Sequence, residues 1–313
     1  MLGRRRAESV AIVSCVTTLE RGEVSDSSDD ASALDAALGD VDWTVAVPGA
    51  IASRFEAPSG ELAVISVGDP AHPRVVLVPG VSGSKEDFAL MLPVISAAGY
   101  YVQTLDLAGQ FESHEAGPPP GGHYSYDLFV GDLVAFLESG APAHLLGYSF
   151  AGTLAQIVLV QRPELVRSLA LLSTPPDVGN GFRHVKWLGP VTRFTPPSTG
   201  ASLMRWGIVT NKNHVPPKRL QFVRDRFAFT RMDSMSDIIG LMKRTPDLRD
   251  ALRASPVPKL VAVGAHDLWP LRYHADFADR IGARLAVYDT GHSPCETSPN
   301  QLSRDLLALY ATA

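Results

Sequence analysis

Short apolar runs alternate with amphipathic helical segments over most of this chain. The run at 74–78 is continuous and rich in β-branched residues, which is typical of a strand buried on both faces. Further strands are expected at 49–56, 61–67, 100–105, 143–147, 168–172, 259–263 and 284–288, and helices at 86–98, 124–138, 151–161, 272–280 and 299–310. This alternation predicts an α/β fold, with a mostly parallel, doubly wound sheet covered by helices on both faces.

Residues 176–250 interrupt the alternation with proline-rich turns and helical stretches. A segment of this length is too long for a loop in a compact domain, so it predicts a helical lid or cap inserted into a core formed by 43–175 and 251–313. From Asp177 to Asp250 there are 13 Lys or Arg and six Asp, an excess of seven positive charges. The excess can attract an anionic substrate. It can also belong to solvated amphipathic helices, and this second interpretation is preferred.

One such helix is expected at 219–229, with Phe222, Phe227 and Phe229 packed while Arg224 and Arg226 stay in water. Aromatic side chains in and near the insertion suggest an apolar substrate pocket, although core packing explains them equally well. The candidates for this pocket are Tyr148, Trp187, Phe194 and Trp206.

The first 42 residues differ in composition from the rest. Residues 20–42 hold eight acidic residues and one basic residue, and so predict a disordered acidic leader over 1–42. The whole chain has a net charge of −5, which gives it no general attraction to nucleic acid. No apolar run is long enough to span a bilayer.

Two cysteines, Cys15 and Cys295, are too few for a disulfide framework or a four-cysteine zinc site. A cytoplasmic location is the default expectation. The alternative is a lipoprotein anchored at Cys15, because Ile12 to Cys15 resembles a bacterial lipoprotein cleavage box after Arg4 to Arg6. Cys295 is expected to be a small buried apolar residue rather than a nucleophile.

A serine stands between small residues where the strand at 143–147 gives way to a helix. The segment reads Gly147-Tyr148-Ser149-Phe150-Ala151-Gly152. A nucleophile elbow needs this arrangement, because the tight turn lifts the hydroxyl out of the sheet at the N-terminus of the following helix. Ala151 stands where the usual motif has its second glycine.

From about residue 50 to 312 the chain resembles the α/β-hydrolase superfamily. Leu77–Ser84 is similar to the oxyanion loop of that superfamily, with Pro79 in place of its histidine. Asp106–Ser113 is similar to its D-x-x-G-x-G-x-S turn, from which Gln110 and Phe111 depart. Val263–Asp267 and Asp289–His292 look like the segments that carry the acid and the histidine of a catalytic triad.

The resemblance implies Ser149 as nucleophile, His292 as base and Asp267 as the acid that orients the imidazole. The backbone N–H groups of Val81 and Phe150 would form the oxyanion hole. The other eight histidines are expected mostly at the surface, and Glu296 is a candidate partner for the His292 loop.

These residues predict a serine hydrolase that cleaves a carboxylic ester or thioester of a small molecule. The alternatives are a carbon–carbon bond hydrolase, an acyltransferase or a cofactor-free perhydrolase with the same triad, or a weakly catalytic binding protein on this fold. Epoxide hydrolases and haloalkane dehalogenases of the superfamily use an aspartate nucleophile, so Ser149 speaks against both chemistries. The sequence has no dinucleotide, P-loop or metal-ligand motif, and the mechanism needs no cofactor or metal. No feature of the chain indicates an oligomeric state.

Overall fold

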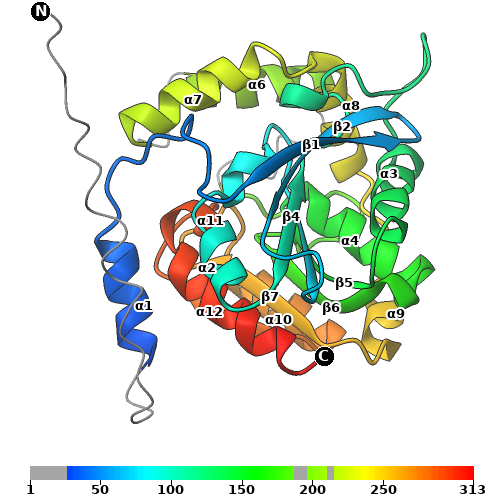
Figure 1. Ribbon diagram of the computed structural model, residues 1–313. Helices are drawn as coiled ribbons and strands as arrows, with labels where there is room; N and C mark the ends of the chain where they lie inside the picture. The colour runs from blue at the N-terminus through cyan, green and yellow to red at the C-terminus, as the bar shows by residue number, and fades with distance from the viewer. Residues whose placement is uncertain (1–26, 187–195, 210–214) are drawn as a thin grey trace, which may run out of the picture.

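A single eight-stranded sheet organises the chain (Figure 1). The computed structural model describes residues 27–186, 196–209 and 215–313. The strand order is β1-β2-β4-β3-β5-β6-β7-β8, with β1 and β2 antiparallel, β2 antiparallel to β4, and all other neighbours parallel. The strands are β1 (Ile51–Ala57), β2 (Gly60–Val67), β3 (Arg74–Val78), β4 (Tyr101–Leu105), β5 (Ala143–Tyr148), β6 (Val166–Leu172), β7 (Lys259–Gly264) and β8 (Arg284–Tyr288). The predicted α/β fold is confirmed.

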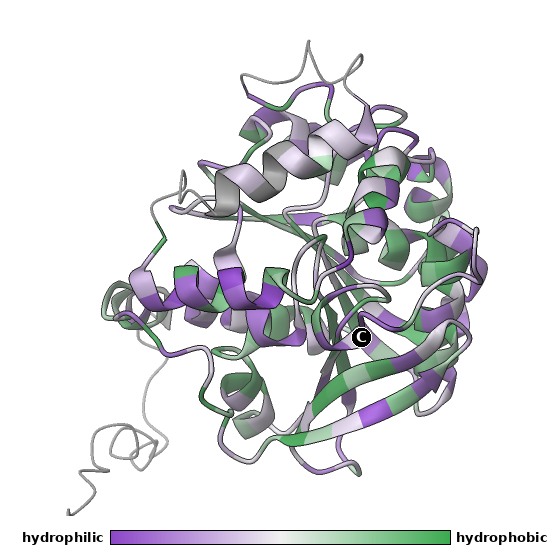
Figure 2. Cartoon of the chain, turned by 90° about the horizontal axis from the view of Figure 1, so that it is seen from above, coloured by the Kyte–Doolittle hydropathy of each residue, from purple (hydrophilic) through white to green (hydrophobic). Residues whose placement is uncertain are grey.

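Helices cover both faces of this sheet because its central strands are apolar on both sides. In β3, Val75 and Leu77 pack toward α2 (Leu92–Ala97) and α12 (Pro299–Tyr310), whereas Val76 and Val78 belong to the core on the opposite face. The opposite face is covered by α3 (Tyr126–Glu138), α4 (Phe150–Gln161), α9 (Arg249–Ala254) and α10 (Leu271–Ile281). Figure 2 shows hydrophobic residues on the central strands and hydrophilic residues along the outer helices.

The helix expected at 86–98 is divided in two. A 3₁₀ turn, η2 (Lys85–Phe88), comes first, and α2 begins only at Leu92. Pro93 lies in the first turn of α2, where its missing N–H costs no intrahelical hydrogen bond. Four further short elements were not predicted: η3 (Phe111–Ser113), η4 (Pro163–Leu165), α9 (Arg249–Ala254) and α11 (Pro294–Thr297).

The segment 176–250 between β6 and β7, called the insertion below, contains helices in its described part. It contains α6 (Pro197–Val209), α7 (Pro217–Phe227) and α8 (Met232–Met242). These helices lie over the carboxyl ends of β3 and β4 (Figure 1), where Arg231 N donates to Gly109 O at 2.9 Å. The insertion therefore covers the edge of the sheet at which α/β proteins bind ligands.

The structure differs from the expected acidic leader over residues 27–42. Helix α1 (Ser27–Ala36) packs along α12 (Figure 1). The carboxylate of Asp35 is buried and accepts hydrogen bonds from the backbone and side-chain N–H groups of Asn300 and Gln301, at 2.8–3.1 Å. A helix N-terminus offers unpaired N–H groups and a favourable dipole, so an acidic segment gains partners there that its composition does not reveal.

No helix in the described part of the chain is both long and apolar enough to cross a membrane. Cys15 lies outside the described residues.

Candidate active site

Ser149 occupies a strained turn between β5 and α4. Its backbone has φ +53° and ψ −119°, a conformation that residues with a side chain rarely adopt. Ser149 N donates to Leu172 O on the neighbouring strand at 2.8 Å, which holds the turn against the sheet. Gly147 must lack a side chain, because a Cβ there would lie 2.6 Å from Gly152 Cα. This is the geometry that the sequence predicted for a nucleophile elbow.

The structure brings Ser149, His292 and Asp267 together from three separate loops. His292 Nε2 lies 3.3 Å from Ser149 Oγ, and His292 Nδ1 lies 2.6 Å from Asp267 Oδ1. A carboxylate can only accept, so Nδ1 carries a proton and Nε2 is available to accept one from the serine hydroxyl. Burial alone would raise the pKa of Asp267, but the neighbouring imidazoles lower it well below its usual value. Asp267 is therefore an ionised carboxylate behind the imidazole.

Two side chains near Asp267 were missed in the sequence. His274 is fully buried, with Nε2 3.3 Å from Asp267 Oδ2, so it is not a surface histidine as expected. It lies on the apolar stripe of α10 with Phe277, Ala278 and Ile281, and that spacing was its signal in the sequence.

Trp269 is the second missed side chain. It is buried with its ring 5.9 Å from that of His292, and its Nε1 donates to Gly181 O at 2.7 Å. Lys186 also reaches this loop, donating from Nζ to Asp267 O at 2.7 Å. Gly181 and Lys186 both belong to the insertion, so its first residues brace the loop that carries the carboxylate.

The predicted oxyanion donors lie on two sides of Ser149. Phe150 is the first residue of α4, where backbone N–H groups have no partner within the helix. Val81 lies in a tight turn closed by Gly83 N donating to Gly80 O at 3.0 Å. The turn is adjacent to the serine, because a Cβ on Gly80 would lie 2.9 Å from Ser149 Cβ. Val81 and Phe150 remain predictions as oxyanion donors.

Of the residues predicted to line an apolar pocket, Tyr148 lies beside His292. Its hydroxyl lies 2.8 Å from Ser293 Oγ, and its ring centroid lies 5.4 Å from that of His292. Trp206 is 56% exposed, because α6 packs on α8 through Ala201 and leaves Trp206 on the outer side. Trp206 stays a prediction as a pocket residue. Trp187 and Phe194 lie outside the described residues.

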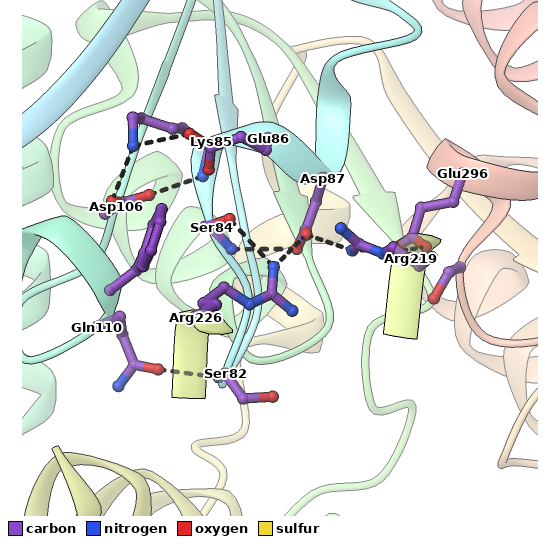
Figure 3. A network of polar contacts seen from close by, with 12 residues as sticks. Ser82, Ser84, Lys85, Glu86, Asp87, Asp106, Gln110, Arg219, Arg226 and Glu296 are labelled. Atoms are coloured by element: carbon purple, nitrogen blue, oxygen red, sulfur yellow. Dashed lines mark hydrogen bonds and ion pairs between the residues drawn. The ribbon is translucent and has the colours of Figure 1, made fainter. Parts of the chain in front are cut away.

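A second set of buried charges fixes the insertion to the core near this site (Figure 3). Asp87 Oδ1 accepts from Arg219 Nη2 at 2.7 Å and from Arg226 Nη1 at 2.6 Å. Arg219 also donates to both carboxylate oxygens of Glu296, at 2.6 and 2.9 Å, and Arg226 donates to Ser84 Oγ at 3.0 Å. Burial alone would raise the pKa of Asp87, but the two arginines lower it below its usual value. We call Asp87, Glu296, Arg219 and Arg226 the arginine cluster.

The arginine cluster corrects two expectations. Phe222 and Phe227 are buried and Arg224 is exposed, as predicted for 219–229. The prediction was wrong for Phe229, which is 54% exposed, and for Arg226, which is buried because it contacts a carboxylate in the core. Glu296 binds Arg219 rather than His292. Cys295 is buried as expected, and burial raises the pKa of its thiol well above the usual value, with a further contribution from the charges of Glu296 and Asp87. A thiol in this state is a poor nucleophile.

Among the described residues, no three His, Cys, Asp or Glu side chains are grouped so that they could hold a metal ion.

Comparison with known proteins places the site in a family. The model of the Alpha/beta hydrolase family matches residues 75–305, which include the whole of the Ser149–His292–Asp267 constellation. A hydrolase from Pseudomonas aeruginosa of known structure has a TM-score of 0.68 and 21% identity, and the match covers 82% of this chain and 97% of that protein. At this identity the likeness establishes the fold alone.

Curated relatives match over shorter regions. The bifunctional epoxide hydrolase 2 of Rattus norvegicus is 31% identical over 105 residues, which are 33% of this chain. The match spans only 19% of that relative. A serine hydrolase-like protein of Homo sapiens is 30% identical over 135 residues, 42% of this chain and 64% of that protein. With this sheet order and a family match over residues 75–305, the chain belongs to the alpha/beta hydrolase family.

Proposed function

We propose that the protein is a serine hydrolase that cleaves a carboxylic ester or a thioester of a small molecule through an acyl-enzyme on Ser149. The observation that carries this proposal is the line of contacts from Ser149 Oγ to His292 Nε2, at 3.3 Å, and from His292 Nδ1 to Asp267 Oδ1, at 2.6 Å. A serine hydroxyl is a poor nucleophile near neutral pH unless a base takes its proton. His292 is the base within reach.

In the proposed reaction Ser149 Oγ attacks the acyl carbon while its proton passes to His292 Nε2. Asp267 accepts the Nδ1–H hydrogen bond and stabilises the imidazolium that forms. The N–H groups of Val81 and Phe150 stabilise the oxyanion of the tetrahedral intermediate. His292 then gives the proton to the leaving alkoxide or thiolate, and the acyl–Oγ ester remains. A water molecule, deprotonated by His292, releases the carboxylic acid and restores the serine.

The nucleophile distinguishes this proposal from epoxide hydrolysis. The rat relative is named an epoxide hydrolase, but the match covers about a fifth of it. The resemblance implies that epoxide chemistry requires an aspartate at the elbow, where this chain has Ser149. We also propose that the insertion acts as a lid, because it covers the carboxyl edge of the sheet and contacts the loops on either side of the site.

The test is hydrolysis of p-nitrophenyl esters of increasing acyl length, with an acyl thioester assayed in parallel. The wild-type protein should turn over at least one of them, and Ser149→Ala should lose that activity while it stays folded by circular dichroism. Ser173→Ala is a matched control, since Ser173 is also buried with positive φ but follows β6. If wild type and Ser149→Ala are equally inactive on every ester and thioester, the proposal fails, and a binding role or carbon–carbon chemistry takes its place.

A further inference from the structure

Two adjacent residues of the turn after β4, Gln110 and Phe111, contact the insertion. Phe111 has φ +39° at the position where the resembling motif has glycine. A phenylalanine in this conformation is strained, so contacts elsewhere must compensate. Its ring packs against those of Phe222 and Phe229, with centroids 5.9 and 6.3 Å away. Its backbone N–H donates to Thr230 Oγ1 at 3.3 Å. The insertion therefore packs on this turn.

Gln110 lies beside Phe111 and is fully buried. Its Oε1 accepts from Ser82 N at 2.9 Å (Figure 3), and its Nε2 donates to Ser234 Oγ at 2.7 Å. The orientation of the amide follows from the chemistry, because the Ser82 N–H can only donate and must face the amide oxygen. Ser234 is on α8, and its hydroxyl in turn donates to Ala108 O at 3.2 Å. One side chain thus joins the loop after β3 to the insertion.

The bond to Ser82 matters because of where that residue lies. Val81 and Ser82 are the two central residues of the turn from Gly80 to Gly83, and Ser82 has φ +59°. Ser82 is buried, so without Gln110 its N–H would have no partner among the contacts that hold this turn. A hydrogen bond to this N–H fixes the Val81–Ser82 peptide, and with it the direction of the adjacent Val81 N–H.

We propose that Gln110 is a positioning residue that holds the proposed oxyanion loop, the turn from Gly80 to Gly83, in its active conformation. Through Ser234, this conformation also depends on the packing of the insertion against the core. The inference rests on the proposed function, since it assigns a use to Val81 as an oxyanion donor. Gln110 does not touch substrate in this account. It acts through the Val81–Ser82 peptide, and Ser234 keeps its amide in place.

The decisive variant is Gln110→Met, which has a similar volume but neither accepts nor donates a strong hydrogen bond. We expect kcat for the best p-nitrophenyl ester to fall about 10- to 100-fold with KM changed less than about threefold, because the oxyanion donor acts mainly in the transition state. The matched control is Gln103→Met. Gln103 is a partly buried glutamine of β4 that accepts from Arg74 at 2.6 Å, and the control should keep wild-type kcat.

A second variant, Ser234→Ala, removes the hydrogen bond at Gln110 Nε2 and keeps the one at Gln110 Oε1. It leaves Gln110 Oε1 facing Ser82 but removes the anchor on α8, so we expect a smaller fall in kcat, about three- to tenfold, again without a matching rise in KM. If Gln110→Met does not fold, Ser234→Ala decides alone. Wild-type kcat in a folded Gln110→Met or, failing that, in Ser234→Ala overturns the inference. A rise in KM with unchanged kcat also overturns it, since that pattern indicates a role in ground-state binding only.

The experiments distinguish a wrong role for Gln110 from a wrong proposed function. If the wild-type protein hydrolyses no ester and Ser149 forms no adduct, the proposed function is wrong and the inference falls with it. If the wild type is active and both variants match it, the hydrolase stands and only the role of Gln110 is rejected.

Discussion

Asp267 and Asp87 are both buried at the carboxyl edge of the sheet, and each carboxylate contacts two basic side chains. The two sites differ in which basic side chains these are. Asp267 contacts His292 and His274, whereas Asp87 contacts Arg219 and Arg226. Both carboxylates are almost fully buried, and in both the neighbouring bases lower the pKa against the effect of burial. The geometry of a buried carboxylate between two bases therefore does not by itself indicate catalysis.

The identity of the base decides what each set can do. An imidazole gains and loses a proton near neutral pH, while a guanidinium keeps its proton throughout the physiological range. His292 is also in contact with a strained serine, whereas the arginines contact Asp87, Glu296 and Ser84. The Asp267 set is suited to proton transfer, whereas the Asp87 set holds the insertion on the core.

Asp267→Asn should have the largest effect on activity. The amide can present N–H to the imidazole and so favour the wrong tautomer of His292, and kcat should fall about ten-thousand-fold with little change in stability. Ester hydrolysis checks this, with Asp289→Asn, a variant of an exposed carboxylate that should resemble wild type, as the control. A loss of less than about tenfold in Asp267→Asn would show that the two aspartates are alike in being structural.

Asp87→Asn should act mainly on stability. It leaves two buried guanidinium groups with Glu296 as their only carboxylate in the cluster, and loss of one partner from a buried ion pair costs about 3–5 kcal/mol. The free energy of unfolding by urea should fall by that amount. Asp225→Asn on the exposed side of α7 should change it by less than about 0.5 kcal/mol. Equal stability of the two variants would contradict an anchoring role for the cluster.

His144 is a buried histidine whose ring faces a hydroxyl, Ser168 Oγ at 2.8 Å, rather than a carboxylate. Burial, with a smaller contribution from the charge of Arg167, lowers its pKa from 6.5 to about 4. Between these values the unfolded chain takes up a proton that the folded protein does not, so stability is lost as the pH falls. His144 should therefore cost up to roughly 3 kcal/mol of unfolding free energy between pH 7 and pH 4.

Urea unfolding across this pH range tests the assignment. The decline in stability should be shallower in His144→Gln than in wild type, while the exposed His72→Gln should keep the wild-type slope. Identical slopes in all three proteins would mean that His144 accepts a proton in the folded state.

The smallest effect is expected at Cys295, which adjoins Glu296 of the arginine cluster. Its thiol is buried and protonated, so Cys295→Ala should keep ester hydrolysis within about twofold of wild type. A loss comparable to that of Ser149→Ala would instead make the thiol part of the reaction.

The sequence predicts the sheet well because each strand carries its own pattern. The segments at 74–78 and 284–288 are strands with the predicted bounds, and the elbow lies where small residues follow a buried strand. The arginine cluster had no local pattern to reveal it. Arg219 and Asp87 are 132 positions apart, and an arginine on an amphipathic helix is ordinarily solvated. Only the packing of α7 on the loop after β3 supplies the carboxylate that lets Arg226 be buried.

The turn after β4 likewise depends on a contact between residues far apart in the sequence. The departures at Gln110 and Phe111 were visible in the sequence, but their meaning depends on Ser234, which lies 124 positions away on α8. The burial of His274 could have been predicted from the sequence, because His274 lies on the apolar stripe of α10.

The most direct test of the central claim is a fluorophosphonate reaction followed by mass spectrometry of the intact protein and of its peptides. We expect one adduct per chain, located on Ser149, and its loss in His292→Ala. A folded wild-type protein that forms no adduct, or an adduct on Ser149 that persists unchanged in His292→Ala, would contradict the claim that His292 activates this serine.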